Sequence, residues 1–205
     1  GAKYVITKFV RANRLIPFFI KNFSFRLKPI LLIRHPIDVC LSQIKTFQTE
    51  DQNKLAPQNL SHSNNHQLDG STKEFLSQLK TELEIKVATW CINNISSLHY
   101  PDLANHLTII FYSDLIINPT AEIRKIFKVL NVPEEITSTI DFRESSDTTI
   151  ANINFKGNPE LQLHKNFNNL EQGTKDKIQA IFDYFNFKLY DAYSPFPHKE
   201  VLKVL

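Results

Sequence analysis

An uninterrupted apolar run that leads straight into a helix pattern constrains the fold of this chain more than any other feature. The run from Pro29 to Ile33 ends in Ile-Leu-Leu-Ile, without polar alternation, and Arg34 follows it. A short run of this kind is typical of a parallel strand that is buried on both faces. Pro36 and Asp38 suit the first turn of a helix, where proline is tolerated and a carboxylate complements the helix dipole. The pattern predicts a buried strand followed directly by a helix.

Strand and helix patterns alternate along the rest of the chain. Two more apolar runs, from Tyr4 to Thr7 and from Leu107 to Tyr112, predict strands. Apolar residues recur at steps of three and four in the predicted helices. These helices cover about residues 11–22, the stretch after residue 34, a long segment that contains Leu76, Leu79, Leu83, Val87 and Trp90, residues 119–130, and about residues 174–187. The alternation predicts one α/β domain over residues 1–205, with Trp90 in its core.

The segment from Gln48 to Thr72 differs from its surroundings because it is polar and lacks periodic apolar residues. We predict a long loop here, and the alternatives are a lid or binding loop and a disordered insertion. His62 and His66 have a spacing that suits a metal on a helix, but the sequence around them is not helical. We therefore expect solvated loop histidines and no metal site.

Charge and composition argue against two classes of protein. The 24 lysines and arginines and 21 acidic residues give a net charge of +3, far from the balance of a sequence-independent nucleic-acid binder. No apolar run approaches the ~20 residues that span a bilayer, so we expect no membrane span. A cytoplasmic location is the default expectation, although Asn-x-Ser sequons at Asn22, Asn59 and Asn94 would permit a luminal one. Cys40 and Cys91 have no metal or redox spacing and are expected to be buried free thiols.

The junction between the buried strand and the helix after it suits an anion. In open α/β sheets, ligands gather at the carboxyl ends of strands, where helix N-termini present free N–H groups. Arg34 stands at that end, and Ser42 shares a helix face with Asp38, so a guanidinium and a hydroxyl can converge on one phosphate. The structural alternative is that Arg34 pairs with Asp38 or another carboxylate. The residues by themselves leave both interpretations open.

Two motifs resemble the PAPS-dependent sulfotransferase family. Arg34–Ser42 reads Arg-x-Pro-x-Asp-x-x-x-Ser and is similar to the family motif that holds the 3′-phosphate of 3′-phosphoadenosine 5′-phosphosulfate (PAPS). The second block comprises residues 109–115, Asn118-Pro119 and residues 123–132, and looks like the family's Tyr-Glu-Asp-Leu strand end, proline and helix. It departs at Ser113, where the family usually has an acid. The resemblance implies a P-loop NTPase-like fold, a three-layer parallel sheet flanked by helices.

The resemblance also implies nucleotide-binding roles for individual residues. Arg34 and Ser42 would bind the 3′-phosphate, and Tyr112 would lie near the nucleotide; a half-buried aromatic that packs on the sheet is the equal alternative for Tyr112. Lys156 and Gly157 are similar to the end of a loop that closes over the 3′-phosphate in the cytosolic branch. A turn with a solvated lysine is the alternative there.

Lys8 is the catalytic candidate that the resemblance implies. Residues 4–8 are similar to a strand that ends in a lysine beside the transferred sulfuryl group, where the lysine stabilises developing charge. An ordinary surface lysine is the alternative. The histidine that follows this lysine in the cytosolic branch is replaced here by Phe9 and Val10, and the glutamate that precedes it in the glycan-modifying branch by Thr7, so the general base is unassigned. Asp114 is expected to be a structural hydrogen-bonding residue.

The family's 5′-phosphosulfate loop, a glycine-containing turn, has no counterpart in the sequence. The chain has 4 glycines, and Gly1 is the only one before Gly70. The sequence also lacks methionine and opens on a strand pattern. We therefore expect a piece of a longer chain, with the donor loop upstream and no activity in the piece alone.

The function implied by the resemblance is transfer of a sulfuryl group from PAPS to a hydroxyl or amine, without a metal. The acceptor could be a small molecule, a lipid or a glycan, and the oligomeric state is not predicted. Two alternatives stay open: a sulfotransferase-like binding or interaction module that has lost its donor loop, and another P-loop-type transferase such as a small-molecule kinase. A Pro-Lys/Arg-Ser-Gly-Thr-type turn upstream would favour the sulfotransferase.

Overall fold

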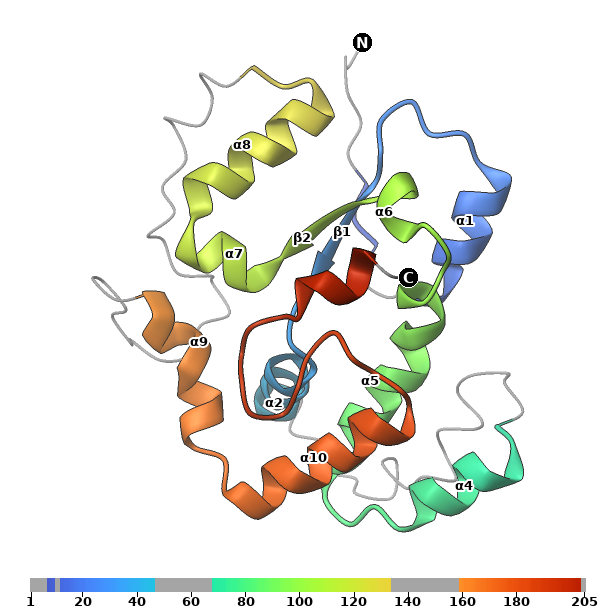
Figure 1. The fold of residues 1–205 in the computed structure, drawn as a ribbon, viewed down its shortest axis with the longest axis vertical. Coiled ribbons are helices and arrows are strands. Elements are labelled where there is room, and N and C mark those ends of the chain that lie inside the picture. Colours follow the sequence, from blue (N-terminus) through green and yellow to red (C-terminus); the bar gives the residue numbers. More distant parts are fainter. Residues whose placement is uncertain (1–6, 10–11, 47–67, 134–158, 204–205) are drawn as a thin grey trace.

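Two parallel strands lie at the centre of the molecule, with helices around them (Figure 1). The computed structural model describes residues 7–9, 12–46, 68–133 and 159–203. Strand β1 (Ile30–Ile33) pairs with strand β2 (Thr108–Phe111), in a register that places Ile33 opposite Phe111. The strands predicted at these two places are confirmed, with slightly shorter bounds. The prediction that the first strand is buried on both faces is wrong, because Ile30 and Leu32 on one face of β1 are 37% and 54% exposed. The strand predicted from Tyr4 to Thr7 lies outside the described residues except for Thr7, which has no regular structure.

Helices make up most of the described chain. Before β1 come η1 (Asn13–Leu15) and α1 (Ile16–Asn22), and between the strands come α2 (Pro36–Thr46), α4 (Gly70–Ser77), α5 (Glu82–Leu98) and α6 (Leu103–His106). After β2 follow α7 (Tyr112–Ile117), α8 (Pro119–Leu130), α9 (Pro159–Asn168), α10 (Gln172–Tyr184) and η4 (Lys199–Lys203). The parallel strand pair joined through helices is an α/β arrangement, as predicted. The three-layer sheet and its P-loop stay predictions, because the described residues contain two strands only.

The predicted long helix around Leu76 and Trp90 is in fact two helices, α4 and α5. Thr81 is the N-cap of α5: its hydroxyl accepts a hydrogen bond from the Glu84 N–H at 3.2 Å, and the Glu84 carboxylate accepts one from the Thr81 N–H at 3.3 Å. This reciprocal capping box satisfies backbone donors that a continuous helix would have bonded internally. The periodicity of the apolar residues runs through the break, so periodicity alone did not reveal it.

The prediction of a loop from Gln48 to Thr72 is wrong at its C-terminal end. Helix α4 begins at Gly70, and the Asp69 side chain accepts a hydrogen bond from the Thr72 N–H at 2.7 Å. An aspartate in this position is a favourable N-cap, which is why the helix starts inside a polar stretch. Residues 47–67, which include His62 and His66, lie outside the described residues.

Replacing Thr81 with alanine should lower the free energy of unfolding by about 1 kcal/mol, because the N-cap hydroxyl is lost and a helix donor is left without it. Urea denaturation of Thr81→Ala against the unmodified chain measures this change. Ser96→Ala is the matched control, since Ser96 is an exposed hydroxyl residue in the last turn of the same helix, far from its N-cap. Equal losses in both variants would mean that the cap contributes nothing of its own.

The core lies where α2, α5 and α10 meet. Ile37 of α2, Val87 of α5 and Phe182 of α10 are all fully buried. Trp90 packs against this core, with its ring 5.3 Å from that of Phe187, so its prediction as a core residue is confirmed. The predicted state of the two cysteines, at positions 40 and 91, is also confirmed, because both are buried free thiols.

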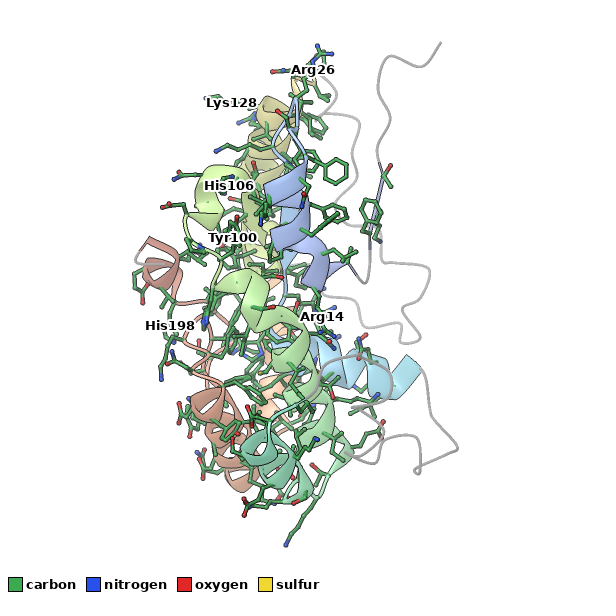
Figure 2. All side chains as sticks on the ribbon, turned by 90° about the vertical axis from the view of Figure 1, so that its right-hand side faces the viewer. Arg14, Arg26, Tyr100, His106, Lys128 and His198 are labelled. Carbon is green, nitrogen blue, oxygen red and sulfur yellow. The ribbon has the colours of Figure 1, made fainter. Side chains whose placement is uncertain are left out.

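The far side of the sheet from α9 carries α1 and α6 (Figure 1). Side chains of α1 and the segment after it, including Phe23 and Phe25, line a pocket together with Asn105 and His106. Figure 2 shows His106 on the side of the molecule where α1 lies. None of the predicted site residues in the described part of the chain belongs to the lining of this pocket.

A buried histidine anchors the junction between β1 and α2. His35 is 2% exposed, and its ring contacts the rings of Phe167 and Tyr190 at 4.7 and 4.6 Å between centroids. Its Nδ1 accepts a hydrogen bond from the Ile37 N–H at 3.0 Å, so Nε2 carries the proton and donates to the Asp191 carbonyl at 2.9 Å. The ring joins the start of α2 to the segment after α10. This anchoring holds the neighbouring Arg34 at the end of β1.

Candidate anion-binding site at the strand ends

The strand register brings two predicted site residues together. Because Ile33 and Phe111 are partners in the parallel pair, the next residue of each strand, Arg34 and Tyr112, leaves the same edge of the sheet. The Arg34 guanidinium carbon lies 4.5 Å from the centre of the Tyr112 ring. A cation over an aromatic face at this distance is held by the ring quadrupole. The structure therefore supplies a contact that the sequence motifs did not predict.

Arg34 also makes the contact proposed in the structural alternative. Its Nε lies 3.9 Å from Asp38 Oδ2, at the outer limit of an ion pair. The two side chains differ in exposure, at 32% for Arg34 and 4% for Asp38. Within the described part of the chain, Arg34 Nε is buried and has no hydrogen-bond partner. Asp38 thus positions the guanidinium without saturating it, and donor capacity is left at the strand end.

Helix α9 closes the third side of this group. Asn166 donates a hydrogen bond to Asp38 Oδ1 at 2.6 Å, and Gln162 donates one to the Tyr112 hydroxyl oxygen at 2.9 Å. The two residues are four apart, so they lie on one face of α9, and that face meets the strand ends. Sequence analysis missed both residues. The sequence shows only that two amide side chains stand four residues apart in a helix, and this spacing does not indicate which distant residues they contact.

Burial and charge oppose each other at Asp38. Removal from water raises the pKa of this carboxyl above its usual value, and the hydrogen bond from Asn166 opposes that rise. Three cationic side chains also oppose it, in the order Arg34, Lys165 and Lys45. The carboxyl therefore has several positive charges around it, carried by β1's end, by α9 and by α2.

The remaining predicted site residues, Ser42, Lys8, Lys156 and Gly157, belong to three separate segments of the chain. Ser42 is one helical turn after Asp38 on α2, and its side chain is exposed. Lys8 is exposed and belongs to a segment without regular structure, not to the end of a strand. Lys156 and Gly157 lie outside the described residues.

Tyr112 and Asp114 belong to helix α7, not to the end of the strand as the motif suggested. Tyr112 is half-buried, and its hydroxyl points to α9. Asp114 accepts two hydrogen bonds from the Lys199 ammonium, at 2.8 and 2.7 Å. These bonds tie α7 to η4, so the prediction of a structural role for Asp114 is confirmed.

The described residues were also compared with the requirements of a metal site and of a membrane span. No group of three or more His, Cys, Asp or Glu side chains there is placed to hold a metal ion. None of the helices there is both long and apolar enough to cross a membrane.

The sequence was compared with protein families and with individual proteins. A family model described as "Sulfotransferase domain" matches residues 14–192. No curated protein and no solved structure matches the chain. The family match includes both motifs, the one that begins at Arg34 and the one around Tyr112, and it spans most of the sequence. The chain belongs to the sulfotransferase domain family.

Proposed function

We propose that this domain transfers a sulfuryl group from PAPS to a hydroxyl or amine of an acceptor. The observation that carries the proposal is the position of Arg34, a partly exposed guanidinium over Tyr112 at the carboxyl ends of two parallel strands. Ligands of open α/β sheets bind at this edge. The domain family supplies the reaction class, and the positive charge around Arg34 suits an anionic donor.

The residues at the strand ends would contribute to donor binding in different ways. Arg34 would donate charge-assisted hydrogen bonds to the 3′-phosphate, and Ser42 would add a hydroxyl donor from the exposed face of α2. The Tyr112 ring contacts the guanidinium, and its hydroxyl is itself held by Gln162. A binding group that is already oriented loses less conformational entropy when the ligand arrives.

PAPS supplies the transferable group when it is bound. In transfer, a bond would form between the acceptor oxygen or nitrogen and sulfur, and the bond from sulfur to the 5′-phosphate oxygen would break. 3′,5′-Adenosine bisphosphate would leave, and the acceptor's proton would pass to water. Protein residues contribute mainly position and charge stabilisation to such a step. Lys8 is the candidate for stabilising the developing charge, and the acceptor is a small molecule, a lipid or a glycan. A cytoplasmic setting stays a prediction.

Binding of 3′,5′-adenosine bisphosphate and 5′-AMP to the complete protein tests the proposal, because only the 3′-phosphate distinguishes these ligands. Hydrogen bonds to a charged group contribute about 1.5 to 3 kcal/mol. Arg34→Ala should therefore weaken bisphosphate binding about ten- to a hundredfold in calorimetric titration and leave AMP binding nearly unchanged. Arg124→Ala, which removes an exposed arginine of α8, is the matched control.

Each other outcome points to a different class of protein. Equal affinity for the two nucleotides, or no change in Arg34→Ala, contradicts the PAPS site. Binding of ATP that depends on magnesium would favour a kinase-like transferase. Absence of any nucleotide binding by the complete protein would favour the interaction module.

A further inference from the structure

Helix α2 presents more than Arg34 and Ser42 to the candidate site. Asp38, Ser42 and Lys45 stand at i, i+4 and i+7 of α2, so they share one face of that helix. Lysine side chains in helices lean toward the helix N-terminus, which brings the Lys45 ammonium back toward Ser42 and Asp38. This placement agrees with the electrostatic effect of Lys45 on the Asp38 carboxyl. The α2 face therefore carries a hydroxyl between a carboxylate and a cation.

Helix α9 brings a second lysine to the same face. Its position is set by two hydrogen bonds, from Gln162 to Tyr112 and from Asn166 to Asp38. Lys165 is adjacent to Asn166 and one turn from Gln162, and it acts electrostatically on Asp38, Arg34 and Lys45. Burial lowers the pKa of Lys165, and the neighbouring charges of Lys45 and then Arg34 lower it further, while Asp38 opposes them. Two helices and a strand end thus bring like charges together.

We propose that Lys165 and Lys45 are additional donor-binding residues that, with Arg34, surround the 3′-phosphate and make the site selective for a nucleoside 3′,5′-bisphosphate. This inference rests on the proposed function and names residues for it that neither motif contains. Like charges held close together repel one another, and an anion placed among them replaces repulsion with attraction. A phosphate monoester carries about −1.5 to −2 charges at neutral pH and offers several acceptor oxygens. It can therefore be shared by three cationic groups.

The contribution of Lys165 also gives α9 a role in recognition. The helix already contacts Asp38 and Tyr112 through neutral amides, which bring no charge of their own. Lys165 adds the charged contact, so a nucleotide that possesses a 3′-phosphate joins α9 to α2 through one ligand. A nucleotide without that phosphate lacks this charged link between α9 and α2.

The test is calorimetric titration of the complete protein and of three variants, Lys165→Gln, Lys45→Gln and Lys165→Arg. In Lys165→Gln and Lys45→Gln, affinity for 3′,5′-adenosine bisphosphate should fall about tenfold, while affinity for 5′-AMP should change less than about twofold. Lys165→Arg should recover most of the bisphosphate affinity because it keeps the charge. Lys73→Gln is the control, since Lys73 is an exposed lysine of α4, which lies far from α9 (Figure 1).

The ratio of the two affinities separates a binding role from a structural one. If Lys165 only stabilised α9, Lys165→Gln would weaken both nucleotides together, and that result would overturn the inference for Lys165. A normal preference for the bisphosphate in both glutamine variants would overturn the inference and leave the proposed function standing. Absence of any preference in the unmodified protein, with Arg34→Ala equally inert, would overturn both.

Discussion

Lowering the pH from 6.5 to about 5 should reduce the free energy of unfolding by about 1.6 kcal/mol through one side chain, the buried His35. Burial lowers the pKa of this histidine from 6.5 to about 3, against the smaller opposing effects of the Asp191 carbonyl and carboxylate. Over this pH range the histidine is increasingly protonated in the unfolded chain but stays neutral in the folded chain. Stability therefore falls as the pH falls, by up to about 1.4 kcal/mol per pH unit.

The hydrogen bonds of His35 explain why the ring resists protonation. Nδ1 accepts from the Ile37 N–H, so a proton on Nδ1 would face another donor and break the bond that starts α2. Nε2 already donates to the Asp191 carbonyl, and the support that this bond gives to a charged ring is smaller than the cost of burying the charge. The rings of Phe167 and Tyr190 exclude water from the site. A charged imidazolium would thus be buried with one bond fewer than the neutral ring.

Urea denaturation at a series of pH values, with His35→Asn as the comparison, isolates this effect. Asparagine can accept the bond from the Ile37 N–H through its side-chain oxygen, but it does not titrate. The pKa of Asp38 shifts upward with burial, which by itself favours the folded state at low pH, and this contribution is common to both proteins. The stability difference between them should shrink steadily from pH 6.5 to about 5. A difference that stays constant over this range contradicts the assignment to His35.

The parts of the fold that sequence predicted correctly are those determined by short-range pattern. The apolar run before Arg34 correctly indicated a parallel strand, although only one face of β1 is covered, since Ile30 and Leu32 are exposed. Helix α8 was correct in its bounds, because a proline begins it and Asn131 ends it in the left-handed conformation, with φ of 52°. The break between α4 and α5 was missed, because the capping box of Thr81 and Glu84 lies inside a regular apolar period.

The residues of the candidate site also fall into two groups, those that local sequence patterns indicated and those that only the fold brings to the site. Arg34 was found because it directly follows a strand, and Tyr112 because its motif resembles that of the family. Parallel pairing of the two strands makes them neighbours. Predicting the contact between the Arg34 guanidinium and the Tyr112 ring requires the register of the two strands, which a single sequence does not specify. Gln162 and Asn166 could not be found, because nothing local to α9 indicates that the helix folds back over a strand end far away in the sequence. Lys165 was missed for the same reason.

Replacing Asp38 with alanine should lower the free energy of unfolding by about 2 to 4 kcal/mol. The carboxyl is 3% exposed, accepts a hydrogen bond from Asn166 at 2.6 Å, and lies 3.9 Å from Arg34 Nε. Alanine leaves the buried Asn166 amide without this acceptor, which costs about 1 to 3 kcal/mol. It also removes the counter-charge of Arg34, but that loss is reduced because the guanidinium is about one-third exposed to solvent.

Asp38→Asn separates the hydrogen bond from the charge. The new amide oxygen can still accept from Asn166, so this variant should lose only about 1 kcal/mol, and denaturant midpoints of the two variants measure the gap between them. Equal losses would mean that the charge matters more than the hydrogen bond. Asparagine also removes the negative charge of Asp38, on which Arg34, Lys165 and Lys45 act, so the cations would repel one another more strongly. Added phosphate should therefore raise the melting temperature of Asp38→Asn more than that of the unmodified protein, since an anion that binds the folded state stabilises it.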